Sequence, residues 1–339
     1  TEDASMSGQI AASRLARRSA AAVIAGAALF GCVSASLAQT YPSSVVKLVV
    51  PFPGGGPLDF VARLLAEKLS ASLKQPFIID NRPGAAGNIG TEAVAKAAPD
   101  GHTLLLVLDT PLTVNPAVYK KLPFDPERDF SPISIVVAFS QMLVVHPSLP
   151  ASSLADFVAY AKKREQPMIF GSGGGSGSPG QLTMEYLRMR AGFSATHVPY
   201  RGNAQVVTDL ISGQVPAGFV AAPGVLQHVK EGRLRALAVS SAQRTELAPD
   251  VPTVIEAGYP DFDVAFYQVL LAPAGVPDSV RTILEREVQQ ALRSSDLREK
   301  LRVQGLTPIG STGAEARGRL RALAERWSEV VKAADIKVE

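Results

Sequence analysis

Two glycine-rich turns, at residues 51–59 and 170–180, constrain most strongly what this chain can become. Each follows a short apolar run that is typical of a strand and precedes a helical pattern. A strand, a glycine turn and a helix start present free backbone N–H groups and the positive end of a helix dipole. Neither turn contains a basic side chain. The pattern therefore predicts that the two turns grip one anion through backbone donors, although plain tight turns are the alternative interpretation.

The second turn also contains the spacing G-x-G-x-x-G between Gly175 and Gly180. A dinucleotide site would need an acidic residue at the end of the next strand, and residues 196–198 supply none. No P-loop lysine follows either glycine run. The sequence therefore predicts no nucleotide cofactor.

The composition is that of a globular chain large enough for two domains. The chain has 339 residues, of which 46% are hydrophobic and 19% are charged, and its formal net charge is +3. The basic residues are spread along the sequence, whereas a nucleic-acid binder concentrates them in a patch. We therefore expect no nucleic-acid partner.

The first 38 residues have the pattern of a cleavable secretory leader. Arg14, Arg17 and Arg18 precede the apolar run 19–33, and small residues follow at the expected cleavage site. We predict a mature protein that begins near Gln39 and is exported to the periplasm.

Cys32 is the one cysteine of the chain, and it lies in this leader. A mature chain without cysteine has no disulfide, thiolate metal site or cysteine nucleophile. Leu29–Gly31 before Cys32 resemble a lipidation motif, but Phe30 is bulky where a small residue is usual. A lipid anchor at Cys32 is the less favoured alternative to a soluble protein.

Short apolar runs alternate with amphipathic stretches along the mature chain, which predicts an α/β fold with parallel sheets. The expected strands are residues 45–50, 77–80, 104–108, 133–137, 142–145, 168–170, 196–198, 217–220 and 235–239. The expected helices include 59–73, 153–163, 277–291 and 313–333.

We expect two α/β lobes, as in periplasmic binding proteins. Residues 39–141 and 263–339 would form lobe 1, and residues 142–262 would form lobe 2. Short crossing segments between them would leave a ligand cleft and permit hinge closure.

The sequence offers no catalytic or metal-binding constellation. The four histidines are far apart, and no G-x-S-x-G turn occurs. His197 lies on a predicted buried strand, which favours a core or hinge position. Asp59 is placed to cap the helix 59–73. Arg201 ends a predicted strand, where ligands of open α/β sheets gather. We therefore expect a binding protein with no metal and no cofactor, not an enzyme.

Several motifs, taken in order, resemble one known family. They are Pro51–Asp59 with Arg63; residues 80–90, DNRPGAAGNIG; residues 99–101, PDG; Asn115-Pro116 with Tyr119; residues 197–202, HVPYRG; Asp209-Leu210 with Gly213; and residues 250–258, DVPTVIEAG. The chain resembles the substrate-binding proteins of tripartite tricarboxylate transporters, the Bug proteins, over residues 41–334.

The resemblance implies a monomeric periplasmic receptor that binds a small organic acid in an interlobe cleft and delivers it to membrane permease subunits. A receptor that signals to a membrane sensor kinase is the alternative. The implied ligand shell is Pro53, Gly54, Gly55, Gly56, Pro57, Asp59, Ser172, Gly173, Ser176, Gly177, Tyr200 and Arg201. Apart from the resemblance, we expect Tyr267 and Phe266 to add an aromatic wall.

The chain also departs from the family pattern. Many members have His at the position of Gln181, an acidic residue near Pro216 or Val220, and Trp near Tyr267. Without a carboxylate near Val220, the second lobe lacks a partner for a ligand ammonium group. Arg201 would supply the one fixed positive charge for a second carboxylate. We therefore expect an organic acid with an apolar or aromatic body and not an amino acid.

Overall fold

The computed structural model describes residues Tyr41–Lys337. The predicted signal peptide and Cys32 lie outside these residues. Residues Ser44–Glu339 form one compact unit. None of the helices in the described part of the chain is long and apolar enough to cross a membrane.

The first sheet is built on three parallel strands that follow the expected runs. They are β1 (Val46–Val50), β2 (Phe77–Asn81) and β3 (Thr103–Leu108), in the order β2-β1-β3. Next to β3 lie β9 (Ala265–Pro273) and then β4 (Phe130–Val145), each antiparallel to its neighbour. The carboxyl ends of β1, β2 and β3 therefore meet at one edge of the sheet.

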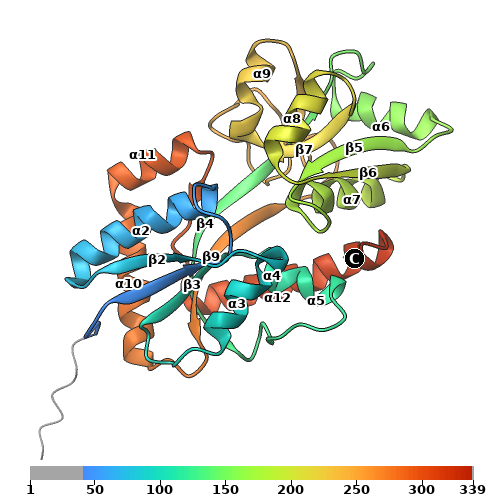
Figure 1. The fold of residues 1–339 in the computed structure, drawn as a ribbon. Coiled ribbons are helices and arrows are strands. Elements are labelled where there is room, and N and C mark those ends of the chain that lie inside the picture. The colour runs from blue at the N-terminus through green and yellow to red at the C-terminus, as the bar shows by residue number, and fades with distance from the viewer. Residues whose placement is uncertain (1–40, 338–339) are drawn as a thin grey trace, which may run out of the picture. The chain divides into compact units, whose positions relative to one another are not determined.

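Helices pack against this sheet (Figure 1), and most of the buried residues of α2, α10 and α12 are apolar. We refer to the sheet and its helices as lobe 1. The helices of lobe 1 are α2 (Pro57–Leu73), η1 (Ala85–Gly87), α3 (Asn88–Ala95), α4 (Thr110–Thr113), α5 (Asn115–Val118), α10 (Asp278–Arg293), α11 (Ser295–Val303) and α12 (Gly313–Ala333). The short strand β10 (Thr307–Pro308) pairs with β4.

The second sheet uses the far end of β4. There β4 lies between β7 (Ala217–Ala221) and β8 (Arg235–Val239), antiparallel to both, and β5 (Met168–Gly173) and β6 (Ala195–Tyr200) continue beyond β7. We refer to this sheet and its helices as lobe 2. These helices are α6 (Leu154–Lys163), α7 (Pro179–Ala191), α8 (Asn203–Ile211), η2 (Ala222–Gly224) and α9 (Leu226–Lys230).

The chain passes between the two sheets at one hydrogen-bonded crossing. Strand β4 changes partner there, from β9 at Ser140 to β7 at Gln141. The fully buried Ser240 hydroxyl accepts from Gln141 N at 2.9 Å and donates to Val264 O at 2.7 Å. Backbone bonds also join Ser240 to Gln141 and to Val264. Strand β4, the residue that follows β8 and the segment that enters β9 are thus tied together where a hinge would lie.

The predicted sheets differ from the observed ones in two respects. Residues 133–137 and 142–145 are parts of the single strand β4, because its backbone stays paired through the polar residues Ser140 and Gln141, first with β9 and then with β7. The sheets are mixed and not purely parallel, because β4 and β9 run against their neighbours. The α/β class is confirmed. The assignment of residues to two separate lobes stays a prediction.

Two helices also differ from expectation. Pro277 is the N-cap of α10 and not its first residue. Helix α11 was not predicted, and its buried residues are only Leu297 and Leu301. By contrast, α12 spans the predicted residues, and Thr312 and Glu315 form a capping box at its start.

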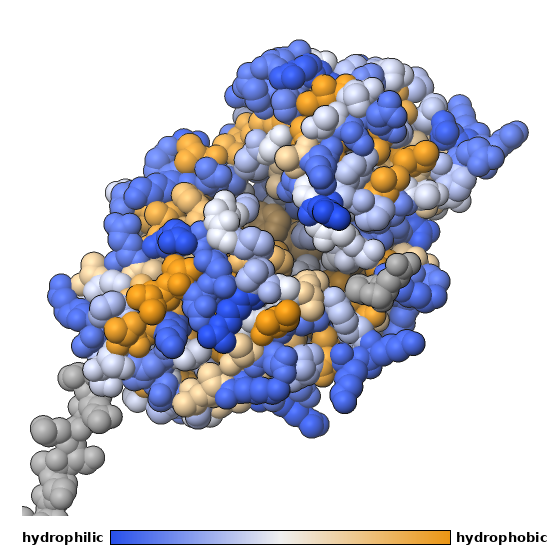
Figure 2. All heavy atoms as spheres, viewed as in Figure 1, coloured by the Kyte–Doolittle hydropathy of each residue, from blue (hydrophilic) through white to orange (hydrophobic). Residues whose placement is uncertain are grey.

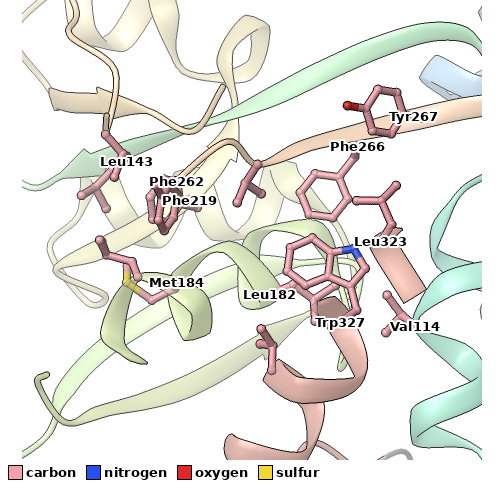
Figure 3. Packing of buried hydrophobic residues seen from close by; sticks show 14 of the residues in the cluster. Val114, Leu143, Leu182, Met184, Phe219, Phe262, Phe266, Tyr267, Leu323 and Trp327 are labelled. Carbon is pink, nitrogen blue, oxygen red and sulfur yellow. The ribbon is translucent and has the colours of Figure 1, made fainter. Parts of the chain in front are cut away.

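Aromatic residues of β9 and α12 anchor the core beside the crossing. The rings of Phe266 and Trp327 stack with centroids 5.5 Å apart and an interplanar angle of 3°. Tyr267, the next residue on β9, points away from this pair (Figure 3). Both stacked residues are fully buried. Helix α12 is thereby packed against the strand that leads out of the crossing.

Candidate functional site

The first glycine turn is held in shape by Asp59. Gly56 is the N-cap of α2, and Asp59 is the third helical residue. The prediction that Asp59 occupies the cap position is therefore wrong, but its carboxylate still satisfies the helix start. Asp59 Oδ2 accepts from the backbone N–H of Gly55 at 2.9 Å. This bond closes the turn over the first residues of the helix.

The Asp59 carboxylate is itself fully engaged. Arg63 Nε donates to Asp59 Oδ2 at 2.8 Å, and Asn81 Nδ2 donates to Oδ1 at 3.1 Å. Asp59 is 3% exposed. The hydrogen bond from Arg63 lowers the pKa of Asp59. An ionised Asp59 paired in this way shapes the turn and leaves no carboxylate for a ligand cation.

The second glycine turn is folded back on the end of β6. The N–H groups of Gly174 and Gly175 donate to Tyr200 O at 2.9 and 3.0 Å. The N–H of Gly177 donates to Gln181 Oε1 at 2.8 Å. Gln181 lies in the first turn of α7, so it shapes this turn as Asp59 shapes the first.

A chain of hydrogen-bonded side chains, in which Ser172 and Ser178 are buried and His197 is half-buried, lies behind the second turn. The Ser172 hydroxyl is 2.7 Å from His197 Nε2 and 2.8 Å from the Ser178 hydroxyl. Burial lowers the pKa of His197 to about 4. The imidazole is therefore neutral at pH 7 and braces the turn. The prediction of a buried strand is wrong here, because β6 lies at the edge of the sheet and His197 is half-buried. Ser172 is fully buried, so it supports the turn from behind and does not face a ligand.

Several backbone donors of the turns have no partner among residues 41–337. They include the N–H groups of Gly54 and Gly56 in the first turn and of Ser176 in the second. Gly54 and Ser176 are exposed. The turns precede α2 and α7, so the positive ends of two helix dipoles lie beside these donors. An anion is the ligand that such donors select.

The segment after β3 lies between the two turns. A Cβ built on Gly177 would lie 3.6 Å from Val114 Cγ1, so the second turn approaches α4 and α5. A Cβ built on Gly87 would lie 3.0 Å from Pro111 and 3.2 Å from Phe52. The ends of β1, β2 and β3 therefore converge at the surface that the second turn approaches. The face in Figure 2 is hollowed between lobe 1 and lobe 2.

The sequence patterns did not predict that this segment after β3 lies beside the two turns. The carboxyl end of the predicted strand 104–108 could have identified it, because ligands of open α/β sheets gather at such ends. Asn115 fixes its position, since Asn115 Nδ2 donates to Asn88 Oδ1 at 2.6 Å.

Asp109, at the start of the same segment, is the most perturbed acid of the described chain. It is fully buried, and neither carboxyl oxygen has a hydrogen-bond partner of good geometry. Burial raises the pKa of Asp109 to about 7, and the nearby backbone N–H groups of Tyr267 and Thr110 offset only part of this effect. Its own N–H donates to Tyr267 O at 2.9 Å. Asp109 is therefore largely protonated in acid.

Tyr200 and Arg201 lie beside the second turn. A Cβ built on Gly173 would lie 2.4 Å from Asn203 Oδ1, so the start of α8 packs directly on the turn. The Tyr200 hydroxyl donates to Asp209 Oδ2 at 2.6 Å, so this hydroxyl already has a partner within lobe 2. Arg201 is exposed and has no partner within the described residues. Arg201 is thus available to a ligand, and the Tyr200 hydroxyl is not.

Tyr267 is not brought to the glycine turns. Its hydroxyl accepts from Arg319 Nη1 at 2.7 Å. It lines two cavities with Arg319, and no residue of either glycine turn lines them. In this structure the Tyr267 side chain is engaged by Arg319 of α12, and its place in an aromatic wall of the ligand site stays a prediction.

The family model of the tripartite tricarboxylate transporter family receptors matches residues 61–336. The chain belongs to this family. It is 37% identical to the protein BugT of Bordetella pertussis over 303 residues, which cover 89% of this chain and 93% of BugT. The resemblance to the Bug proteins is confirmed.

Two solved structures of Rhodopseudomonas palustris proteins share the fold. Rpa4515, solved with adipate, is 35% identical, with a TM-score of 0.76 over 88% of this chain and 99% of that chain. MatC, solved with bound malate, is 30% identical, with a TM-score of 0.72 over 86% and 100%. The protein is therefore a solute-binding receptor, and the expectation that it is not an enzyme is confirmed.

We predict that Asp59→Ala loosens the first turn. The Gly55 N–H and the Asn81 amide would lose their acceptor, which should lower the free energy of unfolding by about 1 to 3 kcal/mol. Urea unfolding measures this loss. Asp278→Ala is the matched control, because Asp278 also pairs with an arginine in a first helical turn but is 85% exposed. Equal losses in the two variants would contradict the role of Asp59.

We predict that Asp109→Asn flattens the pH dependence of stability. With its pKa raised, Asp109 stabilises the fold below pH 4, and this stability is lost as the pH rises through about 7. Between pH 4 and 8 the variant should gain up to about 4 kcal/mol relative to wild type. The opposite slope from His197 between pH 6.5 and 4 is present in both proteins and cancels in the difference.

Urea unfolding from pH 4 to pH 8 measures this difference. Asp278→Asn, at an 85% exposed carboxylate, should keep the wild-type profile. A parallel profile for Asp109→Asn would show that Asp109 is ionised in the folded protein.

Proposed function

We propose that the protein is a periplasmic, monomeric receptor that captures a small organic carboxylate between its two glycine turns and delivers it to membrane permease subunits. The unpartnered N–H groups of Gly54, Gly56 and Ser176 carry this proposal. They sit at the starts of α2 and α7, where a carboxylate is favoured by both hydrogen bonding and the helix dipole.

The ligand shell is proposed to comprise the exposed parts of the two turns and the cation beside them. In it, Pro53, Gly54, Gly55, Gly56 and Pro57 shape the first turn. Gly173, Ser176 and Gly177 shape the second. Asp59 and Ser172 support the turns from beneath, because both are buried and engaged. Arg201 is the one cation beside the turns that has no partner in the described chain.

The charges favour an organic acid over an amino acid. A ligand ammonium group would need a free carboxylate, but Asp59 is bonded to Arg63. Residues 217–222 of lobe 2 are apolar or glycine. The relatives solved with adipate and with malate support a small dicarboxylate. We infer that an acid with an apolar body fits best.

A thermal-shift screen tests the ligand class. A ligand at a hundred times its Kd stabilises the fold by about 2.7 kcal/mol, which raises Tm by about 5 °C for a chain of this size. Adipate and apolar or aromatic monocarboxylates should give the large shifts. Aspartate and glutamate should give none, because their ammonium group finds no partner. The largest shift with aspartate, and none with apolar acids, would contradict the proposal.

Arg201→Gln should weaken dicarboxylates far more than monocarboxylates. The two turns provide for one carboxylate, and the guanidinium is the donor that suits the second. Calorimetric titration with adipate and with hexanoate measures the two losses. Lys163→Gln, which removes an exposed charge on α6, is the control. Equal losses for both acids would reduce Arg201 to a structural residue.

A further inference from the structure

A second cavity lies on the side of the crossing where α10 meets α11. It has a volume of about 870 Å³ and draws its walls from both lobes. Residues 138–140 of β4 form its base, residues 241–247 of lobe 2 form one wall, and residues 293–309 of lobe 1 form another. No residue of either glycine turn lines it, so it is separate from the proposed carboxylate site.

Direct contact between the lobes closes one end of this cavity. A Cβ built on Gly305 would lie 2.9 Å from Pro223 and 3.1 Å from Leu247. Gly305 also has a φ of +64°, a conformation that glycine adopts without strain. The loop after α11 therefore packs on lobe 2 at the rim, which makes this a bounded cavity and not an open surface.

The cavity is rich in arginine. Its five arginines are Arg244, Arg293, Arg298, Arg302 and Arg319, and its three carboxylates are Glu246, Glu299 and Asp263. Arg244 is paired with Glu256, which does not line the cavity, and Arg302 is paired with Glu299. Arg293, Arg298 and Arg319 then face only Glu246 and Asp263, an excess of one positive charge in the lining.

Most of the carboxylates that could neutralise these arginines are already engaged. Glu299 accepts two hydrogen bonds from Arg302, at 2.7 and 2.8 Å. Asp263 accepts from Ala242 N at 3.1 Å. Arg319 donates to the neutral hydroxyl of Tyr267, so its charge is not matched by an acid. Glu246 is the one lining carboxylate without a hydrogen bond in the described residues.

The side chains of Arg293 and Arg298 make no hydrogen bond or ion pair among residues 41–337; both are exposed and line the cavity. They flank the corner between α10 and α11. Two guanidinium groups without ion-pair partners, in a cavity with an excess of positive charge, form a site that attracts anions. Arginine binds phosphate and carboxylate groups bidentately, which favours an anion with more than one charged oxygen.

We propose that this cavity is a second ligand site that binds a compact anion with two or more negative charges, held by Arg293 and Arg298. The chemistry is shared by phosphate esters and polycarboxylates. Because its walls come from both lobes, the bound anion contacts the two sides of the crossing.

Calorimetric titration of the full chain with pyrophosphate, and separately with citrate, tests this site. At least one probe should bind wild type saturably at low salt. The double variant Arg293→Gln/Arg298→Gln should weaken that binding about tenfold or more. Lys162→Gln/Lys163→Gln is the matched control, because it removes the same charge from exposed positions on α6. The control should bind as wild type does.

Two further results complete the test. Asp59→Ala should leave the binding of the responding probe unchanged, which separates this site from the glycine turns. Binding of only one probe supports the proposal and identifies the anion class. Saturable binding of neither probe, equal weakening in the two double variants, or loss only in Asp59→Ala would overturn it. The carboxylate site at the glycine turns is tested by adipate binding, and the result of that test is independent of the result with pyrophosphate or citrate.

Discussion

The buried hydrogen bonds of Ser240 are the constraint on which both lobes depend. The Ser240 hydroxyl joins β4 at Gln141 to the segment that enters β9 at Val264. Three segments of the chain, around Gln141, Ser240 and Val264, are therefore fixed at a single point. Strand β4 runs unbroken through that point and serves as a member of both sheets. Buried polar groups that are fully bonded specify one arrangement, because any displacement leaves donors without acceptors. The positions of the two glycine turns relative to each other follow from this crossing.

At the glycine turns, binding and shaping are divided between backbone and side chains. Asp59 and Gln181 each accept one N–H from their own turn, and Tyr200 O accepts those of Gly174 and Gly175. The N–H groups of Gly54, Gly56 and Ser176 have no partner within residues 41–337. A neutral or already paired side chain adds no net charge to the site. In the proposed site, the turns would therefore select an anion by geometry and by helix dipoles. The neighbouring residues would determine which organic group is attached to the bound carboxylate.

The two sides of the crossing differ in how they would hold an anion. The glycine turns offer backbone donors and almost no free charge, whereas the cavity beside α11 offers arginine side chains and few turn donors. Guanidinium groups respond strongly to the number of charges on a ligand, and they are screened by salt where they are exposed. Binding by backbone donors depends more on how well the shape of the ligand fits the turn. The two proposed sites would thus be chemically distinct anion environments on one framework.

The sequence alone determined the features that depend on near neighbours. The strand–turn–helix units, the glycine turns, α12 with its capping box and the family follow from local patterns within short stretches. Tertiary structure alone decided that β4 is one strand, that Asp59 acts from the third helical position, that Tyr267 turns toward Arg319, and that Asp109 is buried without a partner. Each of these depends on segments far apart in the chain. Burial and strand partners are set by those distant contacts, and no local pattern encodes them.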